Sequence, residues 1–243
     1  MNTAGTSRTP GSGKMLLLAA LATVIVWQLP FGHTILYPFT LLATYAHEMG
    51  HGLTALLVGA EFEQLVMFPN GSGFARWRGN VGRLGRALIS SGGLVGPSVV
   101  GAFLLVISKK ASRAPFILKG MSLFMAVSAL IWARSIFSVL FILTVAAVFW
   151  FFSRGSGKGQ VFVIQFVAVQ MCLAVFSDLD YMFSEGAVVD GRRQPSDVAH
   201  IEEALFLPYW IWGGLVALVS FLVLGLGLRQ ALKSGDSPQK ASA

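Results

Sequence analysis

The chain has 243 residues, of which 55% are hydrophobic and only 12% charged, and its mean hydropathy is +0.70. A soluble domain carries about 25% charged residues, so this composition excludes an ordinary soluble protein and indicates one embedded in lipid. The net charge of +7 comes from 18 basic and 11 acidic residues. Most basic residues lie at the ends of apolar runs, where they anchor spans at the lipid headgroups. We therefore expect membrane lipid, and no nucleic acid, as the partner of this charge.

Apolar runs of membrane-spanning length follow one another along most of the chain. A span needs about 20 mostly apolar residues. The candidates are 15–30, 34–59, 87–108, 115–133, 135–152, 160–180 and 205–228. Only Arg134 separates the fourth from the fifth, so these two form either a tight helical hairpin or one broken helix. The sequence predicts an all-α polytopic membrane protein with about six to seven transmembrane helices.

Polar segments divide the chain. We expect disordered tails at 1–14 and 233–243, with a single transmembrane domain at 15–232 that contains a long polar loop at 181–204. The first apolar run follows Lys14 as in a signal peptide, but it has no convincing small-x-small cleavage site, so we expect a retained span. With seven spans, the 18 basic residues divide equally between the two sides. The positive-inside rule then favours neither orientation.

The second span contains the sequence His47-Glu48-Met49-Gly50-His51. Histidines four residues apart lie on one face of a helix, where both imidazoles can bind one zinc ion. Glu48 is then placed to act as general base on water without being a ligand. Ionisable groups at membrane depth are costly and indicate a functional site. The alternative is a polar seam between helices that binds no metal.

The third metal ligand is less clear in the sequence. The only cysteine, Cys172, excludes a cysteine zinc site, and His33 lies too far along the same helix. A carboxylate is therefore expected, and seven of the 11 acidic residues lie between 178 and 203. We favour Asp178, at the end of the sixth span, with Asp180 as its substitute.

A further candidate aspartate, Asp197, lies close behind a proline later in the chain. After Pro195, either Ser196 or Asp197 is a good helix N-cap. A contact of Asp197 or His200 with the metal site, as support for the ligands, is the less favoured interpretation.

Two further segments flank the predicted metal-binding helix. Residues 61–78 contain Asn70-Gly71 between apolar residues, which predicts a β-hairpin whose exposed edge could pair with an extended peptide. A plain connecting loop is the alternative. The third span begins with a glycine-rich stretch ending at Pro97, which would allow close packing against the metal-binding helix.

Together, HEMGH, the hairpin, GGLVGP and a later aspartate resemble the site-2-protease family of zinc metallopeptidases, and most closely its compact bacterial B-like branch. The resemblance covers roughly 33 to 215. It implies that His47 and His51 bind one Zn²⁺ per chain and that Glu48 is the general base. It also implies a role near the substrate for the GxxGP element, whose members are Gly93, Gly96 and Pro97.

The resemblance matches Asp178 to an aspartate near the end of a late span of the branch, and Ser196-Asp197 to a Ser-Asp pair that follows it. This sequence departs from better-known members, because it has no Asn-Pro-x-Pro motif and its only Asp-Gly pair is Asp190-Gly191. The assignment of the third ligand therefore stays open.

The function we expect is that of an intramembrane zinc endopeptidase in the bacterial cytoplasmic membrane, cleaving membrane-embedded or juxtamembrane segments of membrane-protein substrates. The principal alternative is a non-proteolytic membrane protein, a metal-dependent sensor, scaffold or transporter that retains the HExxH site. A fourth protein ligand would favour a structural metal, and inverted repeats would favour a transporter. A zinc hydrolase acting on lipid is a further alternative.

Overall fold

The computed structural model of the protein describes residues 12–232. The described elements are α1 (Ser12–Gln28), α2 (Gly32–Leu57), β1 (Glu61–Met67), β2 (Gly73–Arg78), α3 (Gly82–Ile107), η1 (Ala111–Arg113), α4 (Ala114–Trp132), α5 (Ile136–Phe152), α6 (Gly157–Ser177), α7 (Leu179–Met182), β3 (Gly186–Val189), β4 (Arg192–Pro195), α8 (Asp197–Leu205) and α9 (Tyr209–Leu232). The predicted tail 233–243 and most of the tail 1–14 lie outside the described residues, and Ser12–Lys14 form the first turn of α1.

The expectation of an all-α polytopic membrane protein is confirmed. Each of the seven predicted spans coincides with a helix, namely α1 to α6 and α9. Within residues 12–232, four helices are long and apolar enough to cross a membrane: α3, α4 extended by η1, α6 and α9. The apolar helices α1 and α5 are shorter. The fourth and fifth candidates form two helices, because the chain leaves the helix at Ala133 and Ser135 caps α5 by accepting a hydrogen bond from the Ser138 N–H.

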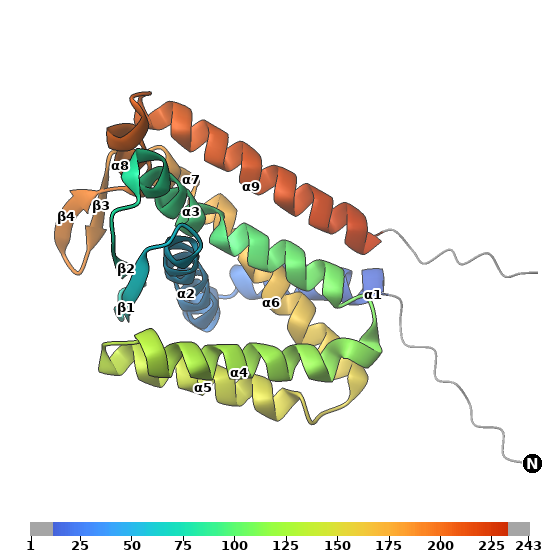
Figure 1. The fold of residues 1–243 in the computed structure, drawn as a ribbon. Helices are drawn as coiled ribbons and strands as arrows, with labels where there is room; N and C mark the ends of the chain where they lie inside the picture. Colours follow the sequence, from blue (N-terminus) through green and yellow to red (C-terminus); the bar gives the residue numbers. More distant parts are fainter. Residues whose placement is uncertain (1–11, 233–243) are drawn as a thin grey trace, which may run out of the picture.

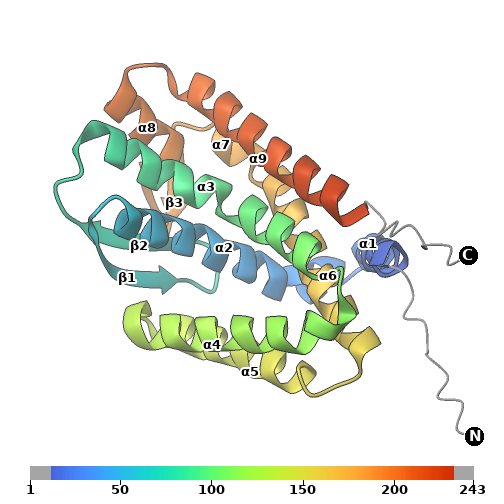
Figure 2. The ribbon, with the colours of Figure 1, turned by 45° about the vertical axis from the view of Figure 1, so that its right-hand side comes forward.

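The helices are arranged around α3, which packs against α2, α6, α8 and α9. The hairpin of α4 and α5 lies on the opposite side of α2 from α9 (Figures 1 and 2). Large apolar side chains on α4, α5 and α9 are exposed, among them Phe116, Leu130, Phe151 and Leu226. This exposure is what a lipid-facing surface requires.

The hairpin predicted at 61–78 is confirmed as β1 and β2, paired antiparallel from Glu61–Arg78 to Met67–Gly73. Its turn contains Asn70 and Gly71, and Gly71 takes a φ of 91° that favours glycine. Asn70 Oδ1 accepts hydrogen bonds from the N–H and the hydroxyl of Ser72. The outer edge of β1 contacts the α4–α5 connection through a bridge between Leu65 and Ala133.

The segment 181–204, expected as a polar loop, contains ordered elements. Residues 186–195 form a second antiparallel hairpin, β3–β4, which turns at Asp190 and Gly191, both with positive φ. This is the two-residue turn that Asp-Gly favours. The short helix α7 precedes the hairpin and α8 follows it, so that both hairpins, α7 and α8 gather at one end of the molecule (Figure 1).

Candidate metal centre

The two motif histidines lie one turn apart on α2, as the HExxH spacing predicts. Their Nε2 atoms are 3.1 Å apart. The Nδ1–H of His51 donates a hydrogen bond to the backbone carbonyl of Ile89 on α3, at 2.8 Å. This bond selects the tautomer in which the Nε2 lone pair is free for a metal, as histidines that bind metals usually donate their other ring N–H to an acceptor.

Asp197, the first residue of α8, completes the group. Its Oδ2 lies 3.0 Å from His47 Nε2, and its Oδ1 lies 3.3 Å from His51 Nε2. The ligand atoms of His47, His51 and Asp197 all lie within 4.8 Å of one another. Burial alone would raise the pKa of Asp197, but the two histidines outweigh it and hold this pKa well below its usual value. The two imidazoles thus favour the ionised form of Asp197.

The start of α8 fixes the position of Asp197. Ser196 is fully buried and caps the helix by accepting a hydrogen bond from the Ala199 N–H. Its own N–H donates to the Glu185 carbonyl at 3.0 Å, and its hydroxyl donates to the Ser184 carbonyl. These bonds close the base of the β3–β4 hairpin. The predicted helix cap, Ser196, therefore also fixes the position of Asp197.

Glu48 lies on α2 beside the histidines and is 5% exposed. Its carboxylate accepts a hydrogen bond from the Ala75 N–H, on the edge of β2 that faces away from β1. The strand lies close against α2, since a Cβ at Gly73 would come within 3.1 Å of the Glu48 side chain. The free edge of β2 therefore faces the predicted general base.

Comparison with known protein families shows which family the chain belongs to. The family model described as peptidase M50B-like matches residues 16–227 of the chain. The chain belongs to the peptidase M50B-like family. This is the B-like branch of the site-2-protease family, as the sequence resemblance indicated. No curated protein and no solved structure matches the chain.

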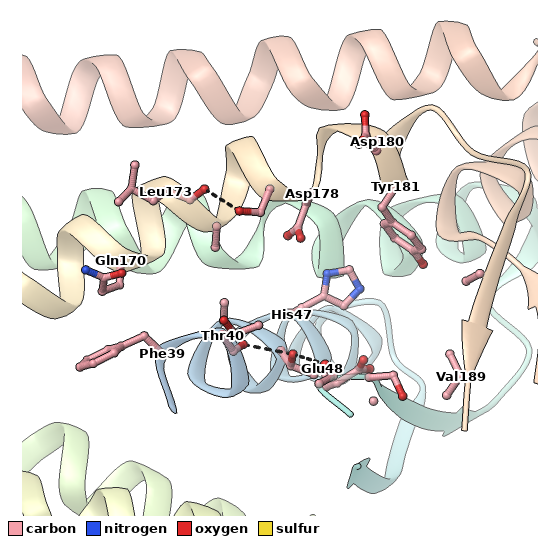
Figure 3. Close-up of a pocket in the computed structure, with 18 of the residues that line it drawn as sticks. Phe39, Thr40, His47, Glu48, Gln170, Leu173, Asp178, Asp180, Tyr181 and Val189 are labelled. Atoms are coloured by element: carbon pink, nitrogen blue, oxygen red, sulfur yellow. Dashed lines mark hydrogen bonds between the residues drawn. The ribbon is translucent and has the colours of Figure 1, made fainter. Parts of the chain in front are cut away.

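In this M50B-like chain, the carboxylate grouped with the two histidines is that of Asp197, for which the sequence interpretation offered only a supporting contact, whereas it favoured Asp178 as the ligand. Asp178 ends α6, lines the same cavity as His47 and Glu48, and turns its carboxylate toward His47, whereas Asp180 points away from it (Figure 3). Neither belongs to the group of ligand atoms around the histidines. The physical reason is that Asp178 follows the last residue of α6 and stays to one side of the group, whereas the start of α8 brings the Asp197 carboxylate against both imidazoles.

Gly93 and Gly96 face α2, and none of Gly93, Gly96 and Pro97 lines the two cavities described below. A Cβ at Gly93 would overlap the His51 ring, and one at Gly96 would lie 2.6 Å from the Ala46 carbonyl oxygen. Pro97 is buried within α3. The structure thus places Gly93 and Gly96, two of the three predicted substrate-binding residues, in the α2–α3 packing, where their small size lets α3 approach the site.

Two cavities of this M50B-like protein meet at His47 and Glu48. The larger, of about 660 Å³, extends along α2 and α6 from Trp27 and His33 to Glu48 (Figure 3). The smaller, of about 200 Å³, contains His47, Glu48, His51 and Asp197 and lies between β2 and the second hairpin. Ala187 and Val189 of β3 line both cavities. The sequence interpretation missed β3–β4, although Asp190-Gly191 between GAVV and RRQP was a hairpin signal.

Proposed function

We propose that this chain is an intramembrane zinc endopeptidase that binds one zinc ion through His47, His51 and Asp197. The observation that carries the proposal is the buried group of two imidazole nitrogens and one carboxylate beside Glu48, at the meeting point of two cavities. Two histidines and a carboxylate are an established ligand set of catalytic zinc, which keeps one position open.

The composition of the site favours catalysis over a structural metal. Within residues 12–232, the group of potential ligands around the two histidines has three members, whereas a structural zinc site usually has four protein ligands. Bound zinc would supply Lewis acidity, lowering the pKa of a water in its open position and polarising the scissile carbonyl.

Glu48 would perform the proton transfers. Its carboxylate accepts the proton of the attacking water and returns it to the leaving amine. The hydrogen bond from the Ala75 N–H restrains this carboxylate. Burial of the surrounding groups excludes bulk water, and the larger cavity provides the route by which the hydrolytic water arrives.

The substrate would be an unwound segment of a membrane protein. A helical segment cannot present its peptide bonds to the site, because its backbone groups bond to one another. The free edge of β2 offers backbone groups to which an extended chain can pair, and it passes directly over Glu48. We place the enzyme in the bacterial cytoplasmic membrane on the strength of its family branch.

The test is cleavage of a membrane-spanning peptide library by the purified protein in liposomes. Glu48→Gln should lower the cleavage rate by about 10²–10⁴-fold, the usual contribution of a general base, while the bound metal is retained. Glu203→Gln, which changes an exposed acid on α8, is the matched control. Cleavage by Glu48→Gln at the wild-type rate would exclude the proposed mechanism.

A further inference from the structure

Tyr181, on α7, contacts the proposed metal site from outside the HExxH motif. Its hydroxyl donates a hydrogen bond to Asp197 Oδ2 at 2.9 Å and accepts one from the Asp197 N–H at 3.3 Å. Its ring meets the His47 ring edge-on, with the centroids 6.1 Å apart. One side chain thus touches two of the three proposed ligands, and Figure 3 shows Tyr181 beside His47.

The position of Tyr181 is set by packing that does not involve Asp197. Tyr181 belongs to α7, where its neighbour Met182 is fully buried. The Met182 carbonyl lies directly against Gly213 of α9, where a Cβ would overlap it. The hydroxyl therefore reaches Asp197 from a backbone segment that α9 already holds in place.

The two hydrogen bonds restrain Asp197 in complementary ways. The bond to Oδ2 limits rotation of the carboxylate, and the bond from the N–H holds the backbone at the first residue of α8. A metal-ligating carboxylate whose other oxygen is hydrogen-bonded is already oriented before the ion arrives. The carboxylate then loses less conformational entropy when the metal binds, and this loss opposes binding less.

We propose that Tyr181 is a positioning residue of the metal site, which holds the Asp197 carboxylate toward the two imidazoles and thereby raises the affinity for the ion. This inference rests on the proposed function, since it assigns Asp197 as a ligand. Tyr181 acts through Asp197, and its hydroxyl is the essential part. The ring packing on His47 can be preserved without the hydroxyl, so the two contributions are separable.

The experiment compares metal binding by purified wild-type protein, Tyr181→Phe and Tyr45→Phe. The Tyr45 variant is a matched control, because it removes a buried hydroxyl that bonds to Ser128 at 2.6 Å, on the side of α2 that faces α4. Zinc affinity is measured by competition with a chelator, and the visible spectrum of the cobalt-loaded protein reports the ligand geometry. Thermal unfolding without metal shows whether both variants fold.

Tyr181→Phe should lower zinc affinity by about 10–100-fold, as loss of the hydrogen-bond partner of a metal ligand typically does, and should change the cobalt spectrum. Tyr45→Phe should change neither. If Tyr181→Phe binds zinc with the affinity and cobalt spectrum of the wild type, the positioning role is wrong while the proposed function stands. If the wild type binds no zinc, both fail.

Discussion

At the scale of single residues, the site depends on how closely α3 approaches the second histidine. The Ile89 carbonyl orients the His51 ring, and Gly93, one turn later, leaves the space that the ring occupies. A glycine that looks like ordinary helix packing in the sequence therefore has a direct effect on a proposed ligand. The sequence could not show that this part of α3 lies against His51, because the alignment of α2 with α3 depends on how the two helices pack.

Gly93→Ala should weaken metal binding, because the added methyl group overlaps the His51 ring and the ring must move. Overpacking of this kind lowers the free energy of unfolding by about 1–3 kcal/mol, and here it displaces a proposed metal ligand. Zinc affinity by chelator competition measures the effect. Gly214→Ala, on α9 with open space around the new methyl group, should bind zinc like the wild type, and equal affinities for the two variants would contradict this account.

At the scale of elements, the two hairpins enclose the site from different sides. Their tips meet where the Asp190 N–H donates a hydrogen bond to the Ser72 hydroxyl at 3.4 Å. Ser72 is itself held by Asn70. Since Ala187 and Val189 line both cavities, separation of the tips would open the site toward β2.

A disulfide between the tips tests whether this separation admits the substrate. The double substitution Ser72→Cys and Asp190→Cys, made in a Cys172→Ala background, should lose proteolysis when oxidised and recover it when reduced. Bound zinc should stay constant in both states, because neither position belongs to the ligand group. Asp190→Cys alone controls for strain at its positive φ of 50°. Full activity of the oxidised protein would show that the tips need not part.

The sequence predicted those elements whose signals are local. Hydrophobic runs placed the helices, Asn70-Gly71 placed the first hairpin, and the HExxH spacing placed His47, Glu48 and His51 on one helix. It offered a contact of Asp197 with the site only as the less favoured interpretation, because Asp197 and His47 are 150 positions apart and meet only through the packing of α8 on α3. Tyr181 was missed for the same reason. No local sequence pattern shows that the short helix α7, which contains Tyr181, contacts the start of α8.

At the scale of the whole molecule, the polar elements and the site lie at one end of the helices. The α3–α4 and α5–α6 connections, the end of α9 and the beginning of α1 lie at the other (Figures 1 and 2). With 26 residues, α3 is about 39 Å long at 1.5 Å per residue, which exceeds the roughly 30 Å of a bilayer core. The two ends are therefore expected on opposite sides of the membrane.

Side-specific labelling tests this arrangement. Single cysteines at Lys110, beside η1, and at Arg192, on β4, are both exposed positions. In sealed vesicles with a Cys172→Ala background, a membrane-impermeant thiol reagent should modify one of them from outside and the other only after the vesicles are opened. Modification of both from the same side would contradict a helix bundle that spans the bilayer in this direction.

The central claim is that His47, His51 and Asp197 hold a catalytic zinc ion with Glu48 beside it. The most direct measurement is the metal content of the purified protein by elemental analysis, for wild type, His47→Ala, Glu48→Gln, Asp178→Asn and Asp197→Ala. We predict about one zinc per chain for wild type, Glu48→Gln and Asp178→Asn, and loss of zinc from His47→Ala and Asp197→Ala. Retention of zinc by Asp197→Ala together with its loss from Asp178→Asn would contradict the ligand set, and a folded wild type that binds no zinc would contradict the metalloprotease mechanism.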